Sequence, residues 1–129
     1  MNKEFIPYEQ ALELKELGFD DKCFAAMDMY SNIDYGSEMY DWIKNGETVQ
    51  STWAALPLYQ QAFRWFREKY NITSEISISA NHRNDAKKWM HSVTNLEVML
   101  YTNSDTAFET YEEAELACLK KLIEIVKNK

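Results

Sequence analysis

The chain has 129 residues, of which 46% are hydrophobic, with only three glycines and two prolines, a composition typical of a folded domain rather than a disordered or collagen-like chain. Twenty-one acidic against fourteen basic residues give a net charge of -7, which disfavours direct binding to nucleic acid or to an anionic membrane. No apolar run approaches the roughly 20 residues that span a bilayer. We therefore expect a single domain over residues 1–129.

The first helix is expected over about Pro7–Leu17. Pro7 suits a helix start because its missing N–H needs no partner there, and Gly18 suits the position just after a helix end. Cys23–Tyr30 then alternates in character with a period of two, with one apolar face, which predicts a strand.

Residues 31–55 form the least regular region, because turn-forming residues interrupt every periodic pattern. We expect one strand near residues 38–44. Asn45-Gly46 is typical of a tight hairpin turn, and a short return strand over Thr48–Gln50 would follow it. The sequence does not decide the secondary structure of the rest of residues 31–55.

The second half repeats the order of helix and strands. A helix is expected over about Pro57–Tyr70, with Asn71 as its left-handed cap. Ile72–Ala80 alternates isoleucines with polar residues, which predicts a strand with one buried and one wet face. Lys88–Thr94 is the expected return strand. Residues 96–108 stay ambiguous between an extension of that strand, a further short strand and a loop.

The last helix is expected over about Tyr111–Lys127. Thr110 and Glu113 have the spacing of a capping box, in which each of the two side chains accepts a hydrogen bond from the backbone N–H of the other residue. The predicted order is α-β-β-α-β-β-α, an α+β fold. Its simplest form is a four-stranded antiparallel sheet with the helices packed on one face, which leaves the other face partly open.

Three segments carry a resemblance to known sequences: residues 5–20, residues 62–70 and residues 110–119. Together, their order of a helix ending in Gly-Phe-Asp, a Trp-Phe-Arg-Glu-Lys-Tyr helix and a Thr-Tyr-Glu-Glu-Ala helix resembles a family of uncharacterised small proteins of phages, prophages and gut Bacteroidetes. The resemblance implies the α-β-β layout and a mobile-element setting. It implies no activity.

Residues suited to catalysis or metal binding do not stand at the spacings that such sites need. His82 and His91 are the only histidines, and neither forms a metal-ligand motif with Cys23 or Cys118. Both cysteines are expected as small core residues with free thiols. We therefore predict no catalytic residue, no metal and no cofactor. The start of the chain has no secretory h-region, so a reducing cytoplasm is expected.

Carboxylates offer a weaker signal. Asp34, Glu38 and Asp41 lie in a polar stretch beside aromatic residues, where paired carboxylates could serve acid–base chemistry on a sugar. A solvated acidic loop is the simpler interpretation, because exposed carboxylates are common.

The number of aromatic residues exceeds the needs of a small core: four Trp, eight Tyr and six Phe. Trp and Tyr are enriched at protein interfaces. The residues expected to form an interaction surface on the open sheet face or in the irregular region are Tyr35, Tyr40, Trp42, Trp89 and His91.

Three functions compete at this point. The first is a non-enzymatic protein–protein interaction module of a mobile element, with a homodimer as its simplest form. The second is an acidic mimic of nucleic acid that inhibits a host DNA-handling protein. The third is an enzyme with an unrecognised site around His82 and His91. The salt dependence of partner binding separates the first two, and a pocket that gathers these histidines with carboxylates would support the third.

Overall fold

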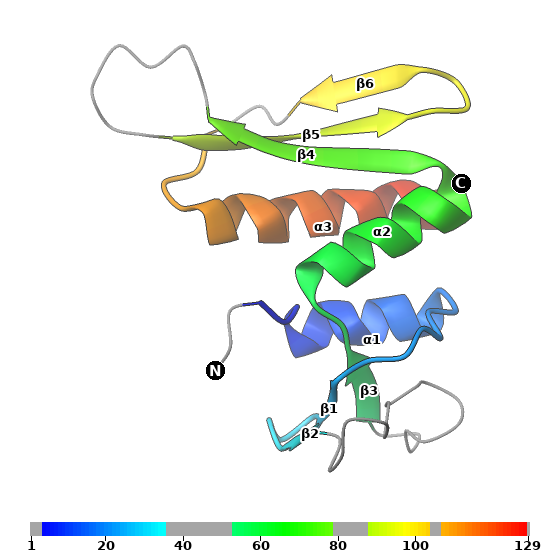
Figure 1. The fold of residues 1–129 in the computed structure, drawn as a ribbon, viewed down its shortest axis with the longest axis vertical. Coiled ribbons are helices and arrows are strands. Elements are labelled where there is room, and N and C mark those ends of the chain that lie inside the picture. Colours follow the sequence, from blue (N-terminus) through cyan, green and yellow to red (C-terminus); the bar gives the residue numbers. More distant parts are fainter. Residues whose placement is uncertain (1–3, 36–52, 79–87, 104–106, 129) are drawn as a thin grey trace. The chain divides into compact units, whose positions relative to one another are not determined.

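The computed structural model describes residues 4–35, 53–78, 88–103 and 107–128, in which helices alternate with antiparallel strands (Figure 1). The elements are α1 (Tyr8–Glu16), β1 (Ala25–Asp28), β2 (Ile33–Tyr35), β3 (Trp53–Leu56), α2 (Tyr59–Tyr70), β4 (Ile72–Ile78), β5 (Trp89–Asn95), β6 (Leu100–Asn103) and α3 (Tyr111–Lys127). The protein is α+β, as the sequence predicts. Its internal contacts group into two compact units, Met1–Gln61 and Ala62–Lys129. The prediction of one domain over residues 1–129 stays a prediction.

The prediction of one four-stranded sheet is wrong. The described strands form two antiparallel sheets of three strands each, in the orders β2-β1-β3 and β4-β5-β6. The sequence analysis assigned no definite strand to β3 or β6, and these two strands each complete one of the sheets: β3 pairs with β1, and β6 pairs with β5. β3 is a continuous apolar run, so it has no alternation to reveal it. The expected strands at 38–44 and Thr48–Gln50 lie outside the described residues.

The repetition of helix and strands does not extend to the order of strands within the sheets. In the first unit the central strand is β1, the first strand after the helix, and β3 returns to its far side. In the second unit the central strand is β5, so β4, β5 and β6 follow one another as a simple meander. The two halves therefore share a sequence of elements but not a topology.

The end of α1 follows its sequence signal. Gly18 has a φ of 95°, in the left-handed region that favours glycine. Its N–H donates to the carbonyl oxygen of Lys15 at 3.1 Å, and the N–H of Phe19 donates to that of Leu14 at 2.9 Å. These are the two bonds of a Schellman motif, and the buried side chains of Phe19 and Leu14 complete it. Pro7 is the N-cap rather than the first helical residue.

β1 is buried along its whole length, so the predicted single apolar face is an underestimate. Its last residue, Asp28, holds the turn to β2. The Asp28 carboxylate accepts hydrogen bonds from the N–H of Tyr30 at 3.0 Å, the N–H of Asn32 at 2.9 Å and the side-chain amide of Asn32 at 3.0 Å. Burial acts to raise the pKa of Asp28, but these hydrogen bonds together hold it below its usual value.

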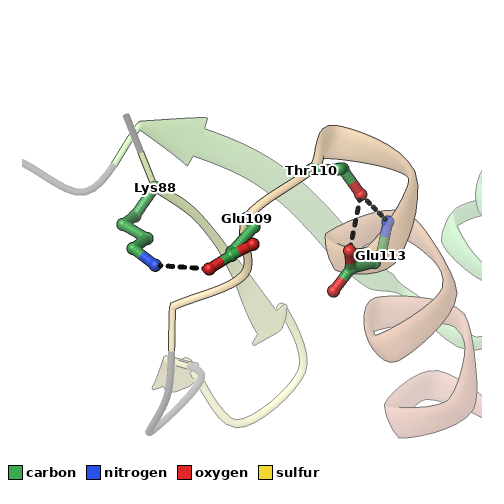
Figure 2. A network of polar contacts seen from close by, with 4 residues as sticks. All are labelled: Lys88, Glu109, Thr110 and Glu113. Carbon is green, nitrogen blue, oxygen red and sulfur yellow. Dashed lines mark hydrogen bonds and ion pairs between the residues drawn. The ribbon is translucent and has the colours of Figure 1, made fainter. Parts of the chain in front are cut away.

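α3 begins at the predicted cap. The hydroxyl of Thr110 accepts a hydrogen bond from the N–H of Glu113 at 3.1 Å and donates one to the Glu113 carboxylate at 3.2 Å (Figure 2). Glu109, the residue directly before Thr110, forms an ion pair with Lys88 at 3.2 Å (Figure 2). The helix packs on β4 and β5. Its buried residues are Ala114, Cys118, Leu119, Leu122, Ile123 and Val126.

Candidate interaction surface

The face of the second sheet that α3 covers is fixed by its register. Residues that pair directly across antiparallel strands point to the same face, and so does every second residue along a strand. Ile76 pairs with His91, and Ser74 lies two residues before Ile76. The Ser74 side chain is hydrogen-bonded to the thiol of Cys118 in α3. His91 and Trp89, two residues apart on β5, therefore lie on the helix-covered face.

The expectation that Trp89 and His91 line the uncovered face is therefore wrong. The ring of Trp89 meets the ring of Tyr111 edge-on at 5.2 Å. His91 is only 7% exposed, and its ring stacks on Phe108 at 6.1 Å. Burial, and then the nearby charge of Lys121, lower the pKa of His91. His91 is thus a neutral histidine of the core at physiological pH.

The other predicted surface residues are placed less fully. Tyr35 ends β2, opposite Ala25 of β1. Tyr40 and Trp42 lie outside the described residues. His82, Glu38 and Asp41 also lie outside the described residues, so the hypothesis of an enzyme site around His82 and His91 stays a prediction.

The two cysteines are free, buried core residues, as the sequence predicts. Burial, with a smaller contribution from Asp21, raises the pKa of the Cys23 thiol to about 12. Burial also raises the pKa of the Cys118 thiol to about 12; Glu115 adds to the rise and the hydrogen bond with Ser74 opposes it. Only a thiolate is a good nucleophile or metal ligand, so both thiols are inert near neutral pH.

The described residues offer neither a metal centre nor a membrane-spanning helix. No group of three or more His, Cys, Asp or Glu side chains gathers there in a way that could hold a metal ion. No helix among the described residues has the length and apolar character needed to cross a membrane.

Among the described residues, the largest run of exposed apolar side chains lies where β5 turns into β6. Its members are 44% to 73% exposed. We call this run the apolar hairpin tip; it consists of Leu96, Val98, Met99, Leu100 and Tyr101. Glu97, which lies between Leu96 and Val98 in the sequence, is the one residue of the stretch 96–101 outside this set. Scattered exposed apolar side chains are ordinary, but five in a six-residue stretch are not.

The apolar hairpin tip is held by polar contacts at its base. The N–H of Leu96 donates to the carbonyl oxygen of Asn71 at 2.8 Å, and the side-chain amide of Asn71 donates to Glu97 at 3.3 Å. The N–H of Glu97 donates to the side-chain oxygen of Asn95 at 3.0 Å. Met99 has a φ of 55°, a left-handed conformation that a long side chain disfavours. The base of the turn is therefore anchored to Asn71 and Asn95, and its apolar side chains lie beyond these contacts.

A smaller exposed pair lies in the first unit. Met29 and Tyr30, in the turn between β1 and β2, are 63% and 77% exposed. They provide a matched control for the apolar hairpin tip, because both groups are apolar or aromatic and both lie in β-turns.

Charge is divided unequally between the two units. Residues 1–61 contain eleven acidic residues and four lysines, and residues 62–129 contain ten of each sign. The whole net charge of -7 therefore belongs to the first unit, and the unit that carries the apolar hairpin tip is balanced.

The exposure of the apolar hairpin tip was not predicted from the sequence. Residues 96–108 are ambiguous from sequence, and the run Leu96–Tyr101 within them fits neither a period of two nor one of 3.6. The available signal was the presence of bulky apolar residues around a turn, where Gly, Asn, Asp and Ser are usual.

Comparison with protein-family models, curated proteins and solved structures finds no match to this chain.

Proposed function

We propose that this protein is a small non-enzymatic interaction module that binds a protein partner through the apolar hairpin tip. The observation that carries the proposal is the exposure of five apolar side chains on one anchored turn. Complete burial of a Leu or Met side chain contributes about 1.5–3 kcal/mol, so a partner that covers this turn gains substantial affinity. A reducing cytoplasm is the proposed setting, since both described cysteines are free.

The residues best suited to chemistry support the same conclusion. Cys23 and Cys118 are buried with raised pKa values, and His91 is buried with a lowered one. All three groups contribute to the cores of their units rather than to a surface where a substrate could reach them.

The experiment that tests the proposal is affinity capture from a host-type lysate with three forms of the tagged chain. The forms are the wild type, a variant with Leu100→Ser and Tyr101→Ser in the apolar hairpin tip, and a variant with Met29→Ser and Tyr30→Ser in the first unit. The proposal expects a protein that the wild type and the Met29/Tyr30 variant retain and the Leu100/Tyr101 variant loses. Equal retention by all three forms would reject it.

A second candidate function, an acidic mimic of nucleic acid, is favoured by the division of charge. A surplus of seven acidic residues within residues 1–61 suits a basic, DNA-handling partner. The proposed mobile-element origin suits such an inhibitor. Salt separates the two candidates: binding through charge weakens steeply as ionic strength rises, and binding through the apolar hairpin tip does not.

A further inference from the structure

The strand that follows the apolar hairpin tip lies at an edge of its sheet (Figure 1). β6 pairs with β5 along one side, and no other described strand pairs with its second side. An edge strand presents backbone N–H and C=O groups that another strand can pair with. What suits such an edge is therefore a β-strand.

The two edges of this sheet differ in how they discourage pairing. β4, the opposite edge, carries the exposed charged residue Glu75 in its middle. β6 has the sequence Leu-Tyr-Thr-Asn, with no charge and no proline. Charged residues and prolines are the usual devices that keep an edge from pairing, so β6 is the undefended edge.

We propose that the occupant of this edge is a second copy of the chain, with β6 of one copy paired antiparallel to β6 of the other. This inference rests on the proposed function and names the partner for the same surface. Because residues 62–129 carry equal numbers of acidic and basic residues, two such units meet without net repulsion, whereas two copies of residues 1–61 would repel each other. Leu100 and Tyr101, the two residues of the apolar hairpin tip that belong to β6, supply buried area, and the strand edges supply the hydrogen bonds.

The register of such a pair follows from the pleat. Leu100 pairs with Asn95 and Thr102 with Val93, so both lie on the face that α3 covers, whereas Tyr101 lies on the open face. A two-fold axis perpendicular to the sheet keeps each face continuous, so a residue can only pair with one of the same face. The overlap of the two β6 strands is greatest when the axis passes beside one of the two central residues, Tyr101 or Thr102, and that residue then pairs with its own copy across the interface.

Cysteine cross-linking tests this geometry. Single variants Tyr101→Cys, Thr102→Cys and, on the opposite edge, Glu75→Cys are oxidised with copper phenanthroline, and dimers are separated without reductant. The native cysteines are buried, so they should not contribute. We expect one of the two β6 variants to form a disulfide dimer at least about tenfold faster than Glu75→Cys, because only directly paired Cβ atoms reach bonding distance. Equal rates at all three positions would overturn the inference.

Light scattering on the wild type and on Thr102→Lys gives an independent answer. The wild type should show twice the monomer mass of 15.2 kDa at high concentration, and the charge at the edge should return it to the monomer. A wild type that stays monomeric at about 1 mM would overturn self-pairing, since even weak association is populated there. If the Leu100/Tyr101 variant still lost a captured partner in that case, the proposed function would stand and this inference alone would fail.

Discussion

The side-chain amide of Asn71 donates a hydrogen bond to the carboxylate of Glu97 at 3.3 Å, and this contact connects the residue directly after α2 with the turn between β5 and β6. The backbone carbonyl of Asn71 accepts a second bond from Leu96 at 2.8 Å. One residue therefore caps a helix and anchors the apolar hairpin tip. The surface proposed to bind a partner is therefore anchored by Asn71, a residue that the sequence already predicts as a left-handed helix cap.

Asn71 can be divided into its two roles. It has a φ of 56°, which glycine adopts freely and alanine does not. We expect Asn71→Ala to lower the free energy of unfolding by about 1 kcal/mol more than Asn71→Gly, because only the alanine variant strains the backbone. Urea unfolding of the two variants measures the difference. Equal losses would mean that the side-chain bond to Glu97, absent from both, accounts for the effect.

Thr110 is expected to matter more than the ion pair beside it, although the two lie close together (Figure 2). Thr110→Ala should cost about 1 kcal/mol of stability because the helix loses its cap, whereas Thr110→Ser should retain most of it. Lys88→Met should change stability by less than about 0.5 kcal/mol, because an exposed ion pair is well screened. Thermal unfolding in low salt compares the three variants. A larger loss in Lys88→Met than in Thr110→Ala would contradict the assignment.

These local features mark what the sequence could predict. The left-handed Gly18 and Asn71 and the cap at Thr110 depend on a few neighbouring residues, so their positions were predicted correctly. Trp53–Leu56 is a strand because it pairs with the remote β1, and Leu100–Asn103 is a strand because it pairs with the adjacent β5; neither segment shows a periodic pattern. The prediction of one four-stranded sheet is wrong because β3 and β6 leave no periodic pattern in the sequence.

The prediction that Trp89 and His91 lie on the uncovered sheet face is wrong because it depends on the register of strand pairing. Trp89 and His91 look like surface residues on an alternating strand, but a shift of one residue exchanges the two faces of a strand. Their faces were decided by the pairing of Ile76 with His91 and by contacts with Phe108 and Tyr111, which sequence alone does not supply.

His91 should make stability depend on pH in the range just below neutrality. Its pKa is lowered in the folded protein from the ordinary value of 6.5, so below that pH the unfolded chain takes up a proton that the folded chain refuses. Stability should therefore fall as the pH drops through about 6.5 towards the lowered pKa. The difference between the wild type and His91→Gln, measured by urea unfolding from pH 8 to pH 5, isolates the effect. A variant that keeps the full slope would show that another group is responsible.

Asp28 should act in a separate, more acidic range. Its pKa is lowered from 3.8, so its charged form stabilises the fold above that pH, and this contribution is lost as the pH falls through the lowered value. Asp28→Asn should be less stable than the wild type at neutral pH, and the gap should narrow below about pH 4. Asp20→Asn, at an exposed position, serves as the control and should leave stability almost unchanged. A gap that stays constant with pH would contradict the role of the carboxylate.

The most direct test of the central claim is a capture measurement with two differently tagged copies of the chain present in one host-type lysate. The immobilised copy is either the wild type, Met99→Gly or the Met29→Ser, Tyr30→Ser control. Met99→Gly removes the most exposed side chain of the apolar hairpin tip, and its φ of 55° suits glycine, so the turn should keep its shape. The account predicts that the wild type and the control retain the second copy or a host protein in high salt and that Met99→Gly retains much less. Equal retention by Met99→Gly and the wild type would contradict it.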